Sequence, residues 1–143
     1  MSEVLKKRIR DHEGFVPKPY LDSLGKATIG YGHLITDEDN FELDKEYSKD
    51  ELLKLFEKDF AKAQMGADQL VGHIPELHIE AKNVVTEMVF QLGTTGVRKF
   101  KNMMAALEAR DYHRASLEML DSRWHAQTTN RCESLSKIMS QCV

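Results

Sequence analysis

Two acidic side chains near the start of the chain, Glu13 and Asp22, have types and spacing that could serve the hydrolysis of a glycosidic bond. Glu13 ends a predicted helix, directly before Gly14, where the negative end of the helix dipole disfavours an ionised carboxylate and suits a proton donor. Asp22 follows in a predicted turn. Such hydrolysis needs one carboxylic acid to protonate the leaving oxygen and one carboxylate to face the oxocarbenium-like centre or to activate water.

Each of these residues also has an ordinary structural explanation. Glu13 could be an exposed residue at a frayed helix end, and Asp22 could bond the backbone of its own turn. Thr28, on the strand that returns from this turn, could place a hydroxyl between the two carboxylates, although threonine is also common in strands. Spacing alone leaves these alternatives open.

The elements that would position these residues follow from the patterning. Apolar residues recur at helical spacing over residues 1–13, and Gly14 is a natural helix stop. Pro17 and Pro19 then forbid a continuing helix. The next stretch is rich in β-branched, aromatic and glycine residues, and residues 22–25 are typical of a turn between two short strands.

A second transition lies at Ser48, which forms a capping-box pattern with Glu51. It opens a run whose apolar residues recur in steps of three and four, which predicts one long helix over residues 48–71. We therefore expect a small β lobe over about residues 14–47 and a C-terminal helical lobe over about residues 76–143, all within a single domain.

The C-terminal lobe is predicted to contain several helices. The first has a wide apolar face that Gly93 stops, and a later one has Asp111 as its candidate N-cap. The shorter predicted helices span Phe100–Leu107, Tyr112–Leu120 and Asn130–Met139. The resulting fold class is α+β, mostly helical.

The composition argues against several classes of protein. The chain has 143 residues, 41% of them hydrophobic and 30% charged, with a net charge of −3, which argues against a nucleic-acid binder that relies on bulk charge. No apolar run is long enough to span a bilayer, so we expect no membrane insertion. The charged N-terminal segment does not resemble a secretory signal. Cys132 and Cys142 are expected to be unbridged, and neither has metal-ligand spacing.

Taken together, the residues of the β region resemble the signature of phage-type lysozymes, the T-even phage lysozyme family. The matching string is Glu13-Gly-x5-Tyr20-x-Asp22-x5-Thr28-Ile-Gly-x-Gly-His33. The resemblance implies that Glu13 is the general acid, that Asp22 and Thr28 hold and activate the attacking water, and that the sugar configuration inverts.

Two further stretches carry the same resemblance. They are Met88-Val-Phe90-Gln91-x-Gly93-x-Thr95-Gly96-Val97-x-x-Phe100 and Ser122-Arg-Trp124-x-x-Gln127-Thr128-x-Asn130-Arg131. With the start of the long helix, these motifs cover nearly the whole chain in the order expected for the family. The resemblance thus implies a two-lobed fold with a small β-hairpin lobe, a long interlobe helix and a C-terminal helical bundle.

The resemblance also implies roles for other residues. Positions that contact sugar in relatives fall on Gly32, Leu34, Phe90, Met103 and Glu118, and Gln91 is expected to face the same cleft. Met103 and Glu118 depart from the smaller polar residues of relatives. Supporting roles fall on Arg131, which would pair with the catalytic acid, and on His33 and Asp59, which would form a salt bridge. We interpret Trp124 as a core or cleft-floor residue rather than a stacking platform.

The function implied is that of a muramidase, which cleaves the β-1,4 bond between N-acetylmuramic acid and N-acetylglucosamine in bacterial peptidoglycan during host cell lysis by a phage. We expect a monomer that needs no metal or other cofactor and that stays in the host cytoplasm until a holin-type pore releases it to the cell wall or periplasm. Two alternatives stay open: a catalytically inactive glycan-binding or virion structural module, such as part of a tail, and a lytic transglycosylase.

Overall fold

The computed structural model describes residues 2–22 and 24–143 of the chain. The chain forms two compact units, Met1–Lys62 and Ala63–Val143. Met1, which we assigned to the first predicted helix, and Ser23, which we assigned to the predicted turn, lie outside the described residues.

Helix α1 of the first unit spans Ser2–Glu13 and ends where Gly14 adopts a left-handed conformation with a φ of 73°. The amide of Gly14 donates a hydrogen bond to the carbonyl of Arg10 (2.9 Å), which closes the last helical turn. Leu5 and Ile9 are buried, as their spacing of four residues requires for one face of a helix. Glu13 is therefore the last residue of α1, directly before the chain turns into the sheet.

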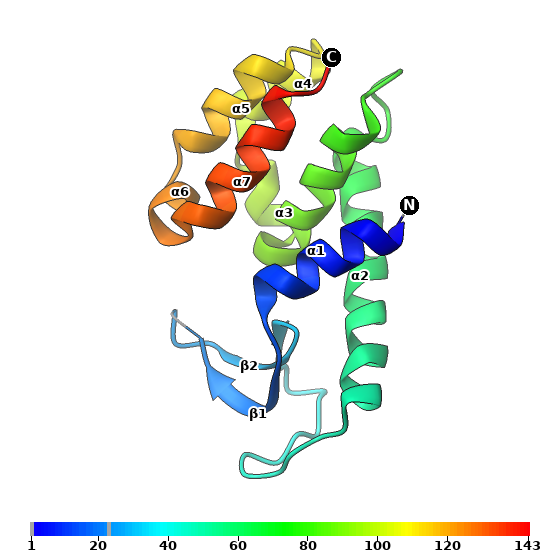
Figure 1. The fold of residues 1–143 in the computed structure, drawn as a ribbon, viewed down its shortest axis with the longest axis vertical. Coiled ribbons are helices and arrows are strands. Elements are labelled where there is room, and N and C mark those ends of the chain that lie inside the picture. The colour runs from blue at the N-terminus through cyan, green and yellow to red at the C-terminus, as the bar shows by residue number, and fades with distance from the viewer. Residues whose placement is uncertain (1, 23) are drawn as a thin grey trace. The chain divides into compact units, whose positions relative to one another are not determined.

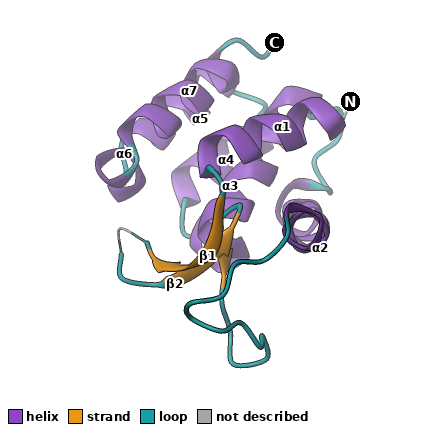
Figure 2. Ribbon diagram, turned by 60° about the horizontal axis from the view of Figure 1, so that its bottom comes forward, coloured by secondary structure: helices purple, strands orange, loops and turns teal. Residues whose placement is uncertain are grey.

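The sheet of the first unit has three antiparallel strands in the described part of the chain, in the order β1–β2–β3. Figure 2 shows β1 and β2 lying side by side. They span Val16–Leu21, Ala27–Gly30 and His33–Leu34. Tyr20 of β1 is paired with Thr28 of β2, and Thr28 is paired on its other side with Leu34 of β3. The register is irregular before Tyr20, where Pro17 and Pro19 have no amide hydrogen to donate.

Helix α2, Lys49–Val71, is the longest element of the described chain (Figure 1). Ser48 caps its start as predicted, because the amide of Glu51 donates to Ser48 Oγ (3.2 Å), and the two side chains are also joined, with Ser48 Oγ donating to Glu51 Oε1 (3.2 Å). The boundary between the two units falls inside this helix, after Lys62. Leu52, Phe56 and Phe60 are buried along one stripe.

The second unit is helical throughout its described elements. After α2 they are α3 (Ile79–Arg98), α4 (Lys101–Glu108), α5 (Tyr112–Leu120), α6 (Arg123–Gln127) and α7 (Thr129–Ser140). Gly93 interrupts α3 with non-helical angles (φ 79°, ψ 160°), so the predicted stop is a kink after which the helix resumes. Asp111 caps α5 as predicted, because its side chain accepts a hydrogen bond from the amide of Arg114 (3.1 Å).

The core of the second unit is built from the inward faces of α2, α3, α4, α5 and α7, and helices α5 and α7 pack side by side (Figure 1). Its residues include Ala67, Val85, Met88, Leu107, Met119, Leu135 and Met139, all fully buried. The predicted fold class, α+β with helices dominating, is confirmed.

Two further findings concern the chain as a whole. Cys132 and Cys142 are free and buried, and burial raises the pKa of the Cys132 thiol to about 11. Within the part of the chain that the structure describes, none of the helices combines the length and the apolar character needed to cross a membrane.

Candidate active site

Glu13 is half-buried and lies against the backbone of Gly32. Gly32 has a φ of 76°, in the left-handed region that side chains avoid. A Cβ atom added at this position would also lie 2.7 Å from Glu13 Cδ and would collide with Glu13 Oε1. Gly32 therefore satisfies two requirements at once, a left-handed turn before β3 and a close approach of the backbone to the carboxyl group.

Asp22 holds the turn between β1 and β2. Its Oδ1 accepts hydrogen bonds from the amides of Leu24 (2.9 Å) and Lys26 (2.8 Å), and its own amide donates to the carbonyl of Lys26 (2.9 Å). The structural explanation considered for Asp22 is therefore correct. A chemical role is compatible with this structural role, because both amide bonds end on Oδ1 and do not involve Oδ2.

Tyr20 is influenced by the charges of both Glu13 and Asp22. Burial raises the pKa of the Tyr20 phenol, and the negative charges of Glu13 and Asp22 raise it further. Both carboxylates therefore act on the same phenol group. The two predicted acids thus both belong to the first unit, Glu13 at the end of α1 against Gly32 and Asp22 in the turn between β1 and β2.

Thr28 lies beside this pair. It faces Tyr20 across the β1–β2 ladder and is buried, with 3% of its surface exposed. Its hydroxyl donates to the carbonyl of Lys26 (2.9 Å), the residue whose amide bonds Asp22. A hydroxyl that has given its hydrogen to a carbonyl keeps its lone pairs for accepting a hydrogen bond from another group.

His33 is held by carboxylates at both ring nitrogens. Nδ1 bonds Asp59 of α2 (2.7 Å) and Nε2 bonds Asp39 of the following loop (2.9 Å). Burial lowers the pKa of His33, but the bonds to the two carboxylates outweigh burial and the pKa is raised. The expected contact between His33 and Asp59 is therefore present, whereas Asp39 was missed. Its Oδ2 also accepts from the amide of Thr36 (2.8 Å), and the Thr-x-x-Asp spacing is the signal that could have revealed it.

Leu34 completes the predicted residues of the β region. It lies on β3, opposite Thr28, and is 47% exposed. Its side chain is therefore open to solvent, and its predicted contact with sugar stays a prediction.

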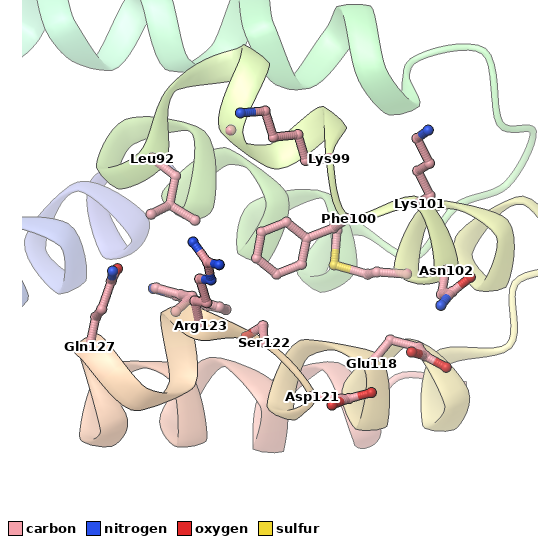
Figure 3. A pocket seen from close by; sticks show the side chains of 13 residues that line it. Leu92, Lys99, Phe100, Lys101, Asn102, Glu118, Asp121, Ser122, Arg123 and Gln127 are labelled. Atoms are coloured by element: carbon pink, nitrogen blue, oxygen red, sulfur yellow. The ribbon is translucent and has the colours of Figure 1, made fainter.

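The second unit contains a cavity of about 520 Å³ (Figure 3). Its apolar lining includes Phe100 and Trp124, whose rings meet edge to face with centroids 6.0 Å apart. The other lining residues are Leu92, Gly96, Lys99, Lys101, Asn102, Met103, Glu118, Asp121, Ser122, Arg123 and Gln127. Its size is ordinary for a small-molecule site.

Two predicted sugar-contact residues, Met103 and Glu118, meet in this cavity. Met103 is fully buried and forms part of the cavity wall, and its predicted contact with sugar stays a prediction. Glu118 is largely buried, and its carboxylate lies 3.8 Å from Arg114 Nε, too far for a strong hydrogen bond. Phe90 is half-buried and packs against the core of the second unit, and it does not line the cavity.

Gln91 is bonded at both ends of its side-chain amide. Its Oε1 accepts from the indole Nε1 of Trp124 (2.9 Å), and its Nε2 donates to Thr128 Oγ1 (3.2 Å). Trp124 is only 3% exposed, which agrees with its interpretation as a core or floor residue. Gln91, Trp124 and Thr128 thus form one hydrogen-bonded group, which the motifs of the sequence did not predict.

Arg131 is buried and its Nε donates to Glu87 Oε2 (2.9 Å), which is fully buried. Glu87 was missed, although a glutamate inside an apolar helical stripe is a signal that a buried partner exists. The pairing of Arg131 with Glu13 stays a prediction. Among the described residues, no group of three or more His, Cys, Asp or Glu side chains is arranged to hold a metal ion.

Comparison with known proteins agrees with this geometry. Residues 10–138 match the phage lysozyme family. A probable T4-type lysozyme 2 of Dictyostelium discoideum is 30% identical over 92% of this chain and 90% of its own length, and a probable T4-type lysozyme 1 of the same organism is 29% identical over 97% and 95%.

A third relative is much longer. The pre-baseplate central spike protein Gp5 of Enterobacteria phage T4 is 31% identical over 97% of this chain, but the match spans only 27% of Gp5. The match along most of the chain, together with carboxylates at both expected positions of one unit, leads to one conclusion: the chain belongs to the phage lysozyme family.

Proposed function

We propose that this protein is a peptidoglycan hydrolase of the muramidase type, which cleaves the β-1,4 bond between N-acetylmuramic acid and N-acetylglucosamine. The observation that carries the proposal is the placement of two carboxyl groups on the elements around one small sheet: Glu13 lies against Gly32, directly before β3, and Asp22 holds the turn between β1 and β2. The T4-type lysozyme relatives, matched over nearly their whole length, support the same activity.

Glu13 is the proton donor in this proposal. Its half-buried carboxyl group, held against Gly32, protonates the glycosidic oxygen as the bond from that oxygen to the anomeric carbon breaks. The leaving sugar departs as an alcohol, and Glu13 becomes a carboxylate. Positive charge develops on the anomeric carbon and the ring oxygen.

Asp22 and Thr28 supply the nucleophile. Asp22 Oδ1 fixes the turn, so its second oxygen accepts one proton from a water molecule, while Thr28 Oγ1 accepts a hydrogen bond from the other O–H of that water, which stays on the nucleophile. The water oxygen then bonds the anomeric carbon from the face opposite the leaving group. The product therefore has inverted configuration, and the two protein groups exchange protons with solvent before the next turnover.

The test compares Glu13→Gln and Asp22→Asn with the controls Glu38→Gln and Asp37→Asn, which make the same chemical changes at exposed positions of the same unit. Clearance of a peptidoglycan suspension should fall by about 100-fold or more in the first two variants and should stay unchanged in the controls. Circular dichroism checks folding, and proton NMR of the new reducing end reports the anomer. If folded Glu13→Gln clears the suspension as fast as the parent, the assignment is wrong.

A second candidate function is a structural module of a virion, and the Gp5 relative, a central spike protein by name, favours it. Under this alternative the parent protein binds glycan or co-sediments with particles but releases no reducing sugar. The predicted phage role and the predicted cytoplasmic location before release through a holin-type pore belong to the hydrolase proposal. Both are tested by expressing the protein with and without a holin and timing host lysis.

A further inference from the structure

Gln91 is not among the residues that line the cavity of the second unit, but it is hydrogen-bonded to one that does, Trp124. Trp124 lines the cavity, and its indole nitrogen donates to Gln91 Oε1 (2.9 Å). Thr128 anchors the other end of the Gln91 amide (3.2 Å), and its own amide and hydroxyl both donate to the carbonyl of Trp124 (2.8 and 3.3 Å). The three residues therefore form a closed group in which each is bonded to the other two.

The donors and acceptors of this group fix the orientation of the Gln91 side-chain amide. An indole nitrogen can only donate, so the oxygen of the Gln91 amide must face Trp124 and its nitrogen must face Thr128. The indole is almost completely buried, and a buried donor that loses its acceptor is costly. Without Gln91, the ring of Trp124 would move toward another acceptor and disturb its edge-to-face contact with Phe100.

We propose that Gln91 is a positioning residue, which holds the indole of Trp124 in the wall of the cavity and does not itself contact substrate. This inference rests on the proposed function, because it takes the cavity to bind part of the peptidoglycan substrate. It also revises the role expected for Gln91, since a side chain whose amide is bonded at both ends within the unit has less capacity left for a sugar.

The first experiment compares Gln91→Met with Gln91→Glu. Methionine keeps the length of the side chain but removes the acceptor, whereas glutamate keeps an oxygen facing the indole. Gln91→Met should raise the KM for soluble peptidoglycan fragments about three- to ten-fold with kcat unchanged, and Gln91→Glu should restore most of the parent KM. Gln64→Met, the same change at an exposed position of α2 in the same unit, is the control.

Trp124 is the one tryptophan of the chain, so its fluorescence reports directly on this group. Gln91→Met should change the emission of the free protein, while Gln64→Met should not. Binding of soluble peptidoglycan fragments is titrated through the same signal in a Glu13→Gln background, where no turnover is needed. There Gln91→Met should weaken binding by the same factor by which it raises KM.

A double-mutant cycle separates positioning from direct contact. If Gln91 acts only through the indole, Gln91→Met should have no further effect on KM in a Trp124→Phe background. A further rise in KM in that background would show that Gln91 touches the substrate and would overturn the proposal. So would an unchanged KM in the single variant, or a loss confined to kcat. Thermal unfolding of each variant confirms that it is folded.

The two proposals fail in different ways. If the parent binds fragments without turning them over, the hydrolase assignment fails while the role of Gln91 is still decided by the titration. If the parent turns over substrate but Gln91→Met binds it as tightly as the parent does, only the positioning role fails. If the parent neither binds nor hydrolyses peptidoglycan fragments, both proposals are wrong.

Discussion

At the scale of single residues, the position of the proposed general acid depends on the absence of a side chain at Gly32. Glu13 Oε1 occupies the space that a Cβ atom at residue 32 would fill, and Gly32 also has a positive φ. Any other residue at this position would strain the backbone and push the carboxyl group away. The same contact thus fixes the loop before β3 and the acid at the end of α1.

Gly32→Ala should therefore reduce activity more than stability. Backbone strain should cost about 1–2 kcal/mol of the free energy of unfolding, and displacement of Glu13 should lower kcat by about ten-fold or more. Gly25→Ala is the matched control, because Gly25 has a φ of 78° but no atom within 4 Å of an added Cβ. Equal activity losses in the two variants, measured with urea unfolding and peptidoglycan clearance, would contradict the predicted displacement.

His33 gives the first unit a pH-dependent contribution to stability. Because its pKa is raised in the folded protein, the bridge to Asp59 and Asp39 contributes fully below the ordinary histidine pKa of about 6.5 and is lost as pH rises through the raised value. The pKa of Asp39 is lowered: burial opposes this, but bonds from Thr36 and His33 outweigh it. The contribution of Asp39 is therefore lost only in stronger acid.

We predict that His33→Asn costs about 1–3 kcal/mol of the free energy of unfolding near pH 5.5 and clearly less near pH 9. Urea unfolding of parent and variant at both pH values gives the difference directly. His113→Asn, at an exposed histidine, should show no such trend. A cost that stays constant or grows toward pH 9 would mean that the charged form of His33 is not the stabilising one.

The residues that sequence reasoning predicted share a property that the missed ones lack. Glu13, Asp22 and Thr28 lie within one short motif, so local spacing is enough to relate them. Glu87 pairs with Arg131, 44 residues further on, and no local spacing states such a pairing, whereas Asp39 lies six residues after His33, outside the motif, and its one local signal was the spacing from Thr36. For Gln91 the residue was identified but not its partners, because the bond to Trp124 joins residues 33 apart.

At the scale of elements, periodicity and capping residues predicted most of the helices, and Ser48 and Asp111 cap as their types predict. Helix α6, Arg123–Gln127, was missed because five residues are too few to leave a periodic signal. The sheet was harder. The pattern predicted two strands, and β3, His33–Leu34, is too short to leave a periodic signal. Gly93 was recognised as a stop, but whether a helix ends or resumes beyond a glycine depends on packing that the sequence does not state.

Packing also overrides propensity within α2. Alanine is a better helix former than glycine by about 1 kcal/mol, so Gly66→Ala would be stabilising in an isolated helix. In the folded second unit, an added Cβ would collide with Thr94 Oγ1 and would lie 2.8 Å from Val89 Cγ1. We therefore predict that Gly66→Ala lowers the free energy of unfolding by about 1–3 kcal/mol.

A second substitution tests the cause of that loss. Thr94→Ala removes the closest atom, so the double variant Gly66→Ala/Thr94→Ala should recover part of the stability lost by Gly66→Ala. Thermal and urea unfolding of the parent, both single variants and the double variant give the coupling between the two positions. Additive effects would show that the collision with Thr94 does not explain the cost.

At the scale of the whole molecule, the balance of charge predicts how activity depends on salt. The chain carries 20 Lys and Arg against 23 Asp and Glu, a net charge of −3. A protein of this charge is weakly repelled by an anionic cell wall over distances comparable with the Debye length, about 8–10 Å at moderate ionic strength. Added salt screens this repulsion, whereas it weakens the attraction that a basic enzyme would have.

We predict that peptidoglycan clearance by the parent stays level or rises by about two-fold as salt increases from about 10 to 150 mM. Asp37→Lys/Glu38→Lys changes two exposed residues of the loop after β3, and since each substitution adds two charges the net charge moves from −3 to +1. This variant should clear the suspension faster at low salt and should slow as salt is added. If the parent itself slows with added salt, a local basic surface rather than the net charge governs its encounter with the wall.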